Sequence, residues 1–449
     1  MNDSADRVRG VFDGVVPSDQ ITAETTGPRD LDLRHAVPVV SPATEAQASE
    51  VLKAAHAERL SVVPIGGGSA MHHGNLPAEA DVLVSTELLD ATVDYEPRDL
   101  TVVVESGKRL AQLQDEARGS DQFLALDPPN ASRATVGGVL STSGSGPMRR
   151  TYGTPRDLCL GIRAVLADGT IIKSGGRVVK NVAGYDLTKL FIGSHGTLGL
   201  IVQAAFRLHP LPRREAGLLC VFKSLDEATS AACTVTHSQL QPRVLELIDL
   251  QDAMWGDTSR DESAPALLIT FGDIPEAVDY QVERGASAMH EAGSTEVRTL
   301  SEEDVGAWHT RIRDVLDAAH EDPTVVVCRI GTLMTTVPLV LRVVGQLAGP
   351  SEPGVQSMVD WSDGIVRAVV SVPASAETSE VASAVEKVRQ QVMEAGGRLV
   401  VESAPADVKR LLDVWGPPTG PVALMQQLKD RLDPHHLLNR GRYHREIGG

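Results

Sequence analysis

The stretch "VVPIGGGSAMHHG", from Val62 to Gly74, places three consecutive glycines directly after a short apolar run. Glycine permits a positive φ and carries no Cβ, so a ligand can approach its backbone closely. Successive N–H groups in such a loop form a nest that suits a diphosphate. The stretch also fits a tight turn between two strands, and taken alone it leaves both interpretations open.

Two common nucleotide-binding motifs do not fit this loop. The dinucleotide fingerprint needs G-x-G-x-x-G at the opening of a helix. Here "SAMHHGNLPAEA" follows the glycines, with a proline and no helical apolar stripe. A phosphate loop of the Walker type requires the sequence GKS or GKT at its end, and no lysine follows the glycines here.

The bulk composition excludes several classes of protein. The chain has 42 basic and 60 acidic residues, a net charge of −18, which argues against nucleic acid as a partner. No run of apolar residues is long enough to insert directly into a membrane, and the N-terminus has no apolar core of a secretory signal. None of the four cysteines forms a C-x-x-C pair, so we expect a reducing, cytoplasmic setting and no iron–sulfur cluster held by this chain alone.

Short strands alternate with helices up to about Pro212. Thr44 and Gln47 have the spacing of a capping box at the start of a helix. The pair Asp168–Gly169 stands between two β-prone runs and predicts a hairpin with a type I′ turn. "NVAGYDLTKLFIG" has the pattern of a helix, and "GTLGLIVQAAFRLHP" that of a glycine turn leading into a strand.

The pattern changes in the second half of the chain. From Leu218 onward, strand-like runs alternate with longer helical stretches such as "TSEVASAVEKVRQQVMEAGG", which predicts a second, α+β domain with a largely antiparallel sheet. "GPVALMQQLKDRLDPHHLLNRGRYH" predicts a helix that ends near Leu432, followed by an irregular tail.

A second loop rich in glycine and hydroxyl residues, "DPPNASRATVGGVLSTSGSGPMRRTYG", runs from Asp127 to Gly153. Two such loops in one domain suggest a long ligand that is held along its length. A flexible linker would have a similar composition. The "DPP" opening and the apolar Val136 and Val139 favour an ordered segment.

Four blocks occur together and in order: "PIGGGS", "DPPNASRATVGG", "GRVVKNVAGYDLTKLFIGSHGTLGLI" and "LDPHHLLNRGR". Jointly they resemble the FAD-linked oxidases of the vanillyl-alcohol oxidase/PCMH superfamily. The third block is most similar to the FAD-binding E subunits of bacterial glycolate oxidases. The resemblance is strong from Val37 to Leu211 and in the C-terminal tail, whereas residues 215–400 share only the strand–helix texture.

The resemblance implies an α+β fold with a two-part PCMH-type FAD-binding domain and an α+β cap domain whose sheet is largely antiparallel. We therefore expect an N-terminal extension over 1–36, the FAD-binding domain over 37–212 and the cap over 213–400. A C-terminal helix and tail over 401–449 would return to the FAD-binding domain.

The resemblance also implies which residues contact FAD. The diphosphate would lie over the three glycines and Ser69, the second loop would line the flavin, and the tail would close the site. The implied set is Pro64, Ile65, Gly66, Gly67, Gly68, Ser69, Pro128, Thr135, Gly137, Gly138, Ser141, Gly144, Ile201 and Asn439. Some members of the superfamily attach FAD through a histidine. We expect noncovalent FAD here, since His72 and His73 read as exposed neighbours in a turn.

No catalytic residue is assigned from the sequence, and four candidates are open. By resemblance, Lys180 lies at the isoalloxazine edge, and His195 stands where the family often has glutamate. His195 is either close to the flavin or a loop residue in water. Arg329 and Arg367 interrupt apolar strands and could bind a carboxylate in pairs of hydrogen bonds. Period-2 alternation favours an outward-facing position for both arginines.

No metal site is expected. Related hydroxy-acid dehydrogenases carry an H-x-G-D-G-N-x-H stretch whose histidines hold a metal, and this chain lacks it. The cap histidines are isolated from one another, whereas metal sites need clustered ligands. These histidines are His237, His290, His309 and His320.

The resemblance implies an FAD-dependent oxidoreductase that takes part in oxidising a small 2-hydroxy acid to a 2-oxo acid. In the family's complex, a second flavin subunit and an iron–sulfur subunit are partners, and a membrane is reached only through a partner. Two alternatives remain open: a stand-alone FAD oxidase or dehydrogenase of another hydroxy acid or alcohol, and a non-catalytic FAD-binding scaffold.

Overall fold

The computed structural model describes residues 3–25, 31–33, 35–176, 185–249, 264–347, 355–373 and 375–447. The chain forms two compact units, which we describe separately. The first unit comprises Met1–Gly146, Tyr152–Leu211 and Asp413–Gly449. The second comprises Pro147–Thr151 and Pro212–Leu412. Lys180 falls outside the described residues, so the structure says nothing of its position.

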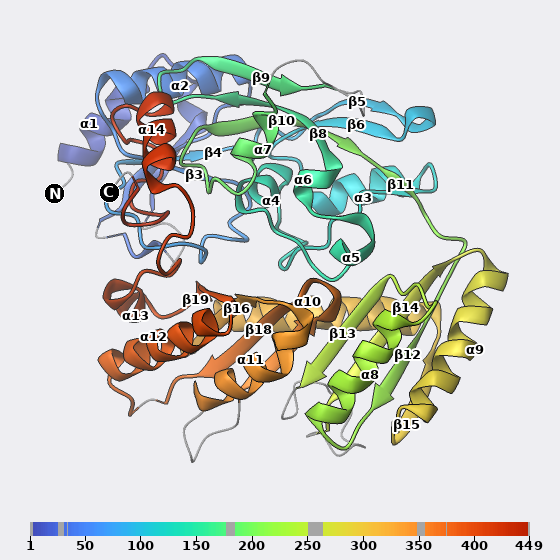
Figure 1. The fold of residues 1–449 in the computed structure, drawn as a ribbon. Coiled ribbons are helices and arrows are strands. Elements are labelled where there is room, and N and C mark those ends of the chain that lie inside the picture. The colour runs from blue at the N-terminus through green and yellow to red at the C-terminus, as the bar shows by residue number, and fades with distance from the viewer. Residues whose placement is uncertain are drawn as a thin grey trace. The chain divides into compact units, whose positions relative to one another are not determined.

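The first unit contains a four-stranded sheet in the order β1-β2-β4-β3, packed against helices α1 and α2 (Figure 1). The apolar stripe of α2 buries Val51 and Leu52 in one core with Val40, Val62 and Val82 of the strands. The elements are α1 (Asp3–Val11), β1 (Ile21–Thr25), β2 (Val37–Val40), α2 (Glu45–Ala57), β3 (Val62–Ile65) and β4 (Val82–Ser85).

The capping box of α2 is shifted by one residue from the expected arrangement. The hydroxyl of Thr44 accepts the backbone N–H of Gln47 at 3.1 Å, as expected. The side chain of Gln47 returns to the N–H of Ala43, at 2.7 Å, and not to that of Thr44. The helix start is nevertheless where the sequence predicts it.

The first unit also holds a five-stranded antiparallel sheet in the order β5-β6-β10-β8-β9. Its strands are β5 (Thr92–Glu96), β6 (Thr101–Glu105), β8 (Cys159–Val165), β9 (Ile171–Gly175) and β10 (Leu200–Arg207). The remaining short elements are α3 (Leu110–Arg118), β7 (Gln122–Phe123), α4 (Val136–Thr142), α6 (Pro155–Leu158), α7 (Thr188–Phe191), β11 (His209–Pro210) and α14 (Val422–Leu432). Helix α5 (Arg149–Tyr152) contains residues of both units, because the boundary between them falls after Thr151.

The hairpin β8–β9 is present, but its predicted type I′ turn is wrong. A type I′ turn needs a positive φ at both central residues, and only Gly169 has one, at +86°. The carboxylate of Asp168 accepts the N–H of Thr170 at 2.8 Å, and the N–H of Leu166 donates to the Thr170 carbonyl at 2.9 Å. Asp168 thus stabilises a loop longer than a two-residue turn, and it does so without adopting a positive φ.

The second unit is built on one eight-stranded antiparallel sheet in the order β15-β12-β14-β13-β17-β18-β16-β19. This confirms the predicted α+β cap with an antiparallel sheet. The strands are β12 (Arg214–Val221), β13 (Val244–Asp249), β14 (Ala266–Asp273), β15 (Glu296–Leu300), β16 (Val325–Gly331), β17 (Gln356–Asp360), β18 (Ile365–Ser371) and β19 (Arg398–Ser403).

Helices cover both faces of this sheet, with α8, α11 and α12 in front of it and α10 behind it in the view of Figure 1. Leu219 on one face of β12 packs with Ile312 of α10, whereas Leu218 on the other face lies against Gly285 of α9. The helices are α8 (Leu225–His237), α9 (Pro275–Glu291), α10 (Glu302–Glu321), α11 (Val337–Val344), α12 (Thr378–Glu394) and α13 (Ala406–Leu411). Among the described residues, no helix is long and apolar enough to cross a bilayer.

Candidate functional site

The end of β3 and the loop after it form one wall of a cleft in the first unit. The space between the walls is about 700 Å³, open solvent at the mouth included. Several separate segments line it: the glycine loop, α4 with its cap, the turn before β10 and the C-terminal tail. The lining residues are Pro64, Ile65, Gly66, Gly67, Gly68, Ser69, Ala70, Met71, Thr86, Thr135, Gly137, Gly138, Ser141, Thr142, His195, Gly196, Gly199, Leu200, Ile201, Asn439 and Arg442.

The three consecutive glycines have different roles. A Cβ on Gly66 would lie 2.2 Å from the Thr135 hydroxyl, and one on Gly67 would lie 1.7 Å from the Arg133 carbonyl oxygen. These two glycines therefore let the two loops pack against each other. Gly68 has φ +70° and open space around its missing Cβ, so a ligand in the cleft can approach its backbone.

The second loop is not a loop throughout, because it contains helix α4. Thr135 caps this helix, its hydroxyl accepting the N–H of Gly138 at 3.4 Å. The N–H groups of Val136 and Gly137 donate to the carbonyls of Lys108 and Ser106 at 3.0 and 2.7 Å. The first turn of α4 is thus satisfied by the protein, and the helix presents its glycines to the cleft.

His195 lies in the turn that joins α7 to β10, with a left-handed φ of +53°. Its N–H donates to the Ser141 carbonyl at 2.8 Å. Its ring packs edge-on against Trp415, with centroids 4.7 Å apart. Burial lowers the pKa of His195 well below 6.5, and the charges of His73 and Arg442 lower it further, so the imidazole is neutral. Its ring therefore packs within the protein and does not stand free in water.

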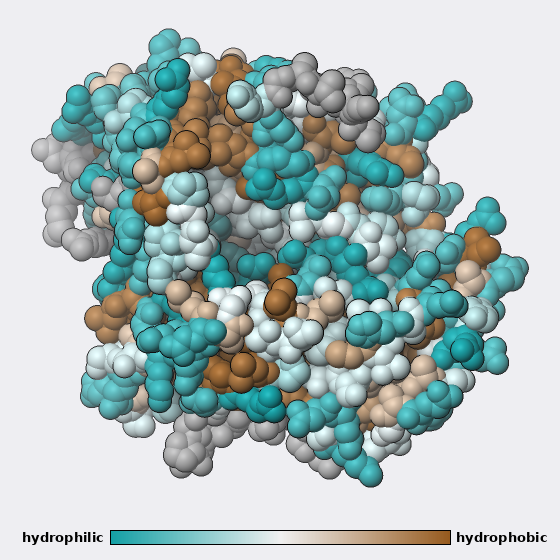
Figure 2. Space-filling view, in the orientation of Figure 1, coloured by the Kyte–Doolittle hydropathy of each residue, from teal (hydrophilic) through white to brown (hydrophobic). Residues whose placement is uncertain are grey.

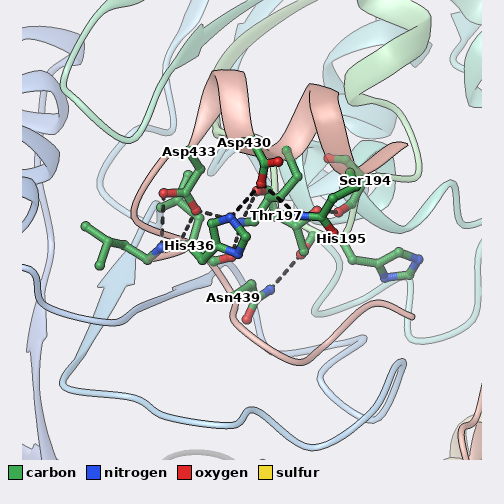
Figure 3. A network of polar contacts seen from close by, with 11 residues as sticks. Ser194, His195, Thr197, Asp430, Asp433, His436 and Asn439 are labelled. Carbon is green, nitrogen blue, oxygen red and sulfur yellow. Dashed lines mark hydrogen bonds and ion pairs between the residues drawn. The ribbon is translucent and has the colours of Figure 1, made fainter. Parts of the chain in front are cut away.

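The tail brings Asn439 to the cleft. Its backbone N–H donates to the Val62 carbonyl at 2.8 Å, and its side-chain Nδ2 donates to the His195 carbonyl at 2.6 Å. Figure 3 shows the amide reaching toward this turn. Its buried Oδ1 has no hydrogen-bond partner among the described residues. A ligand with an N–H group at this point would satisfy that oxygen.

Arg442 adds a buried positive charge to the same wall. Its guanidinium donates to the carbonyls of Asn75 and Met71, at 3.0 and 2.8 Å. No aspartate or glutamate lines the described part of the cleft. The polar lining consists instead of this cation, an amide and several hydroxyls, which suits an anionic ligand.

A buried pair behind the cleft fixes the tail. Lys429 Nζ donates to Asp433 at 2.6 Å, to the Thr197 carbonyl at 2.8 Å and to the Leu438 carbonyl at 3.1 Å. Asp433 in turn accepts the N–H groups of Leu437 and Leu438, at 3.0 and 2.8 Å. Figure 3 shows the carboxylate of Asp433 among these donors.

Most of the residues implied for FAD line this cleft. Pro128 and Gly144 do not, although they lie close to each other. The sequence reasoning missed Met71, Thr86 and Arg442. Met71 and Arg442 lie within the quoted stretches, but nothing in the patterns marked them as contacts, and Thr86 lies outside every motif. His72 is buried with 5% exposure, so the expectation of an exposed pair of histidines is wrong for it. In the tail, Nε2 of His436 lies 2.8 Å from the Asp430 carboxylate.

The second unit holds a cluster of charges around Glu402 of β19, which is 6% exposed. Its carboxylate lies 3.7 Å from Arg329 Nε, 3.5 Å from Arg367 Nε and 3.6 Å from His320 Nε2. Arg329 and Arg367 are direct cross-strand partners. Their side chains are 35% and 12% exposed, so the outward-facing position expected for both is wrong for Arg367.

Asp360 lies at the end of β17, near this cluster. Burial raises its pKa to about 7, and the negative charge of Asp363 adds to the rise, while Arg149 and Arg367 oppose it. Asp360 Oδ2 has no hydrogen-bond partner among the described residues. Arg149 pairs with Asp363 at 2.5 Å. In the part of the chain that the structure describes, no group of three metal-ligating side chains is found.

Comparison with known proteins identifies the family. A family model described as "FAD binding domain" matches residues 37–175, and one described as "FAD linked oxidases, C-terminal domain" matches residues 211–443. The chain belongs to the FAD-linked oxidases. FAD is therefore its cofactor, as the resemblance implied, and the chain is an FAD-dependent oxidoreductase.

Several curated relatives of this FAD-linked oxidase are named for hydroxy acids. It is 25% identical over 414 residues to "Glycolate oxidase subunit GlcD" of Bacillus subtilis, covering 90% of this chain and 88% of the relative. It is 33% identical over 265 residues to "D-lactate dehydrogenase" of Archaeoglobus fulgidus, covering 57% of this chain and 59% of the relative.

Solved structures share the fold of this oxidase. p-Cresol methylhydroxylase has a TM-score of 0.72 at 14% identity, covering 98% of this chain and 97% of that one. Alkyldihydroxyacetonephosphate synthase has the same TM-score at 16% identity, and the match covers 96% of this chain and 84% of that one. These likenesses confirm a PCMH-type fold.

The residues of the cleft fit FAD. Gly68 offers backbone to a phosphate, Arg442 supplies a positive charge, and the unsatisfied Asn439 oxygen can accept an N–H group of the flavin ring. The absence of carboxylates among the lining residues that the structure describes avoids repulsion of the diphosphate.

Proposed function

We propose that this FAD-linked oxidase takes part in the oxidation of a small 2-hydroxy acid to a 2-oxo acid. The observation that carries the proposal is the cluster in the second unit, where two arginines share one buried glutamate beside an aspartate with a pKa of about 7. Such a cluster combines a binding group for a carboxylate with a group that can take up a proton at neutral pH. Relatives named for glycolate and D-lactate support the substrate class.

We assign the substrate carboxylate to Arg329, because its side chain is the more exposed of the two arginines. Glu402 holds the guanidinium in place, and Arg367 shares the negative charge of that glutamate. Asp360, when ionised, accepts the proton of the substrate hydroxyl. His195, kept neutral by burial, leaves the flavin side of the first unit without an added positive charge.

FAD, when bound, supplies the acceptor for the hydride from the hydroxyl-bearing carbon. The chain's own contribution in the first unit is to bind and orient it through the glycine loop, the α4 glycines and Asn439. We propose noncovalent binding. His72 is enclosed beside the glycine loop, and its ring lies 4.6 Å from that of His73.

We propose further that the chain works in a complex of the glycolate oxidase type, in the role of an E subunit, with a second flavin subunit and an iron–sulfur subunit. The relative from Bacillus subtilis is itself named a subunit, GlcD, and this supports membership of a complex. The E role rests on the resemblance of the block "GRVVKNVAGYDLTKLFIGSHGTLGLI". Three of the four cysteines are buried, and burial raises the pKa of Cys159, Cys220 and Cys328 to about 12, so they are poor cluster ligands. We expect the complex in the cytoplasm, with any contact to a membrane made by a partner.

The test is a visible spectrum of the purified, FAD-loaded chain before and after anaerobic addition of glycolate or D-lactate. Bleaching of the flavin bands by either acid is expected. Bleaching that appears only after the partner subunits are added would assign this chain an accessory role. A flavin that neither acid bleaches, in the isolated chain or in the complex, would contradict the proposal. The alternative of a non-catalytic FAD-binding scaffold would then remain.

The variant Arg329→Met sharpens this test. Because each hydrogen bond to a charged group contributes about 1.5–3 kcal/mol, loss of the guanidinium should weaken substrate binding by about 10- to 100-fold. Arg342→Met is the matched control, since Arg342 is an exposed arginine of α11 in a long ion pair with Asp226. Equal substrate affinity in both variants would remove Arg329 from the site.

A further inference from the structure

A second cavity lies in the first unit behind the turn that carries His195. Its volume is about 380 Å³, or about 1040 Å³ when the open solvent at its mouth is included as it was for the FAD cleft. It is formed by α7, the turn that follows it, α14 and the end of the tail. Its lining residues are Arg156, Lys189, Leu190, Ile192, Gly193, Ser194, Thr197, Leu198, Met425, Leu428, Lys429, Asn439, Arg440, Gly441, Tyr443 and Ile447. We propose that this cavity binds a small amphipathic molecule with an apolar body and a hydrogen-bond-accepting oxygen.

The volume and the apolar walls favour a small molecule. Binding pockets for such ligands measure about 300–1,000 Å³ and are lined mainly by apolar side chains with a few convergent polar groups. Leucine, isoleucine, methionine and tyrosine side chains make up the apolar wall here. Figure 2 shows the apolar surface gathered between α14 and α7. Leu424, one helical turn before Leu428 on α14, is 52% exposed.

The polar wall of the cavity carries three basic side chains. Arg156, Lys189 and Arg440 line the cavity, and no aspartate or glutamate does so among the described residues. Ser194 is 8% exposed, and its hydroxyl has no hydrogen-bond partner among the described residues. Lys189 lies 3.8 Å from Asp186 and Arg440 lies 3.2 Å from Glu79, so these two cations are partly neutralised. Their remaining N–H groups, together with Arg156 and Ser194, still make the wall rich in hydrogen-bond donors, and a carbonyl or carboxylate oxygen is the group that matches them.

Lys429 does not supply a free donor to this cavity. All three of its N–H groups are engaged, with Asp433, Thr197 and Leu438. It forms the rigid back wall instead.

The cavity adjoins the FAD cleft. Asn439 lines both. In the turn before β10, Ser194 and Thr197 line the cavity, whereas His195 and Gly196, which stand between them in the chain, line the cleft. Because the two sites share a wall, we expect a ligand in the cavity to change the absorption and fluorescence of FAD in the cleft.

Two probes distinguish a neutral ligand from an anionic one. Duroquinone is a neutral ring with carbonyl oxygens, and decanoate is an apolar chain with a carboxylate. Each is titrated by calorimetry into the oxidised, FAD-loaded protein, and the flavin spectrum is recorded in parallel. We expect at least one probe to bind with a micromolar Kd and to shift the flavin bands. Binding of duroquinone assigns a neutral carbonyl ligand, and binding of decanoate alone assigns an anionic one.

The variant Leu428→Trp fills the cavity and is expected to weaken binding by at least about tenfold, a change of about 1.4 kcal/mol. Gln427→Trp is the matched control, since Gln427 is an exposed residue of the same helix outside the cavity lining. Failure of both probes to bind at millimolar concentration would overturn the proposal. Equal binding of the probe to both variants would also overturn it. So would a Leu428→Trp variant that changes its oligomeric state but still binds the probe. The titration needs no turnover, so its outcome is independent of the proposed oxidation.

Discussion

Three adjacent glycines of this chain serve two different purposes. Gly66 and Gly67 are required by the second loop, whose backbone and Thr135 side chain come too close for any Cβ. Gly68 is required by its own conformation and by the open space in front of it. The motif therefore reports both how the first unit is packed and where its ligand lies.

Alanine substitutions should separate these two purposes. Gly67→Ala is expected to lower the melting temperature of the FAD-free protein, because its Cβ would overlap the Arg133 carbonyl. Gly68→Ala has room, and its strain at positive φ costs only about 1–2 kcal/mol. It is expected to weaken FAD binding more than Gly67→Ala does, relative to its effect on stability. Thermal melting without FAD and fluorescence titration with FAD measure the two effects. The reverse ranking would contradict this division.

Asp360 should determine the pH dependence of flavin reduction. Its pKa is raised to about 7, and only the ionised form can accept the substrate proton. The rate of anaerobic flavin reduction is therefore expected to rise as the pH increases through about 7. Below that point, the rate should fall by about tenfold per pH unit.

Two variants test the assignment of that pH step. Asp360→Asn should abolish the step and slow the reaction at every pH. Asp363→Asn removes the negative charge that helps to raise the Asp360 pKa, so the midpoint should move to lower pH. An unchanged midpoint in Asp363→Asn would assign the step to another group.

The residues of this cluster show what a sequence alone cannot supply. Arg329 and Arg367 stand out because a charge interrupts an apolar strand, and that signal located them. Their shared partner, Glu402, lies on a third strand far along the chain, and nothing in its local sequence sets it apart. The contact with Glu402 allows the arginines to be partly buried. Period-2 alternation does not include this contact, and it therefore predicted an outward position that Arg367 does not have.

At the scale of elements, α14 and the tail after it act as one piece. Lys429 and Asp433 are spaced one helical turn apart and are buried together, with exposed fractions of 3% and 0%. Burial lowers the pKa of Lys429, while Asp433 and Asp430 oppose this. The pair ends the helix, turns the chain, and sets the position of Asn439.

Lys429→Met should therefore affect both stability and cofactor binding. The variant leaves Asp433 buried without its cation, a change that costs about 3–5 kcal/mol in buried pairs. We expect a lower melting temperature and a weaker affinity for FAD. Lys53→Met is the control, because the Lys53–Glu50 pair is exposed and such pairs contribute about 1 kcal/mol or less. If Lys429→Met retained normal FAD affinity, Asn439 would not depend on this pair.

Elements with a long, clear periodicity were predicted well. Helix α14 ends at Leu432, as expected, and the helical stretch of the cap became α12. The short helix α4 was not predicted, because glycines and hydroxyl residues have low helix propensity and its 7 residues make only about two turns. The type of the β8–β9 turn depended on a side-chain hydrogen bond of Asp168, which no dipeptide rule includes.

At the scale of the whole molecule, the four sequence blocks were sufficient for the family and for the class of fold, because each contains residues with strict spatial requirements. The second unit has no such motif, and its topology could not be derived from texture. Three strands of its sheet, β16, β17 and β18, pair in an order that differs from their order in the chain. Such a crossover depends on long-range contacts that leave no local pattern.

The first unit is assembled from three separate stretches of chain, and the last of them, Asp413–Gly449, carries Asn439 and Arg442. On the ribosome, the glycine loop emerges early, but the residues that complete the cleft are made only after the whole of the second unit. A nascent chain therefore has no finished place for the cofactor. FAD therefore binds late, after the chain has been synthesised and the preceding parts have folded. A bound FAD is thus a sign that synthesis and folding are complete.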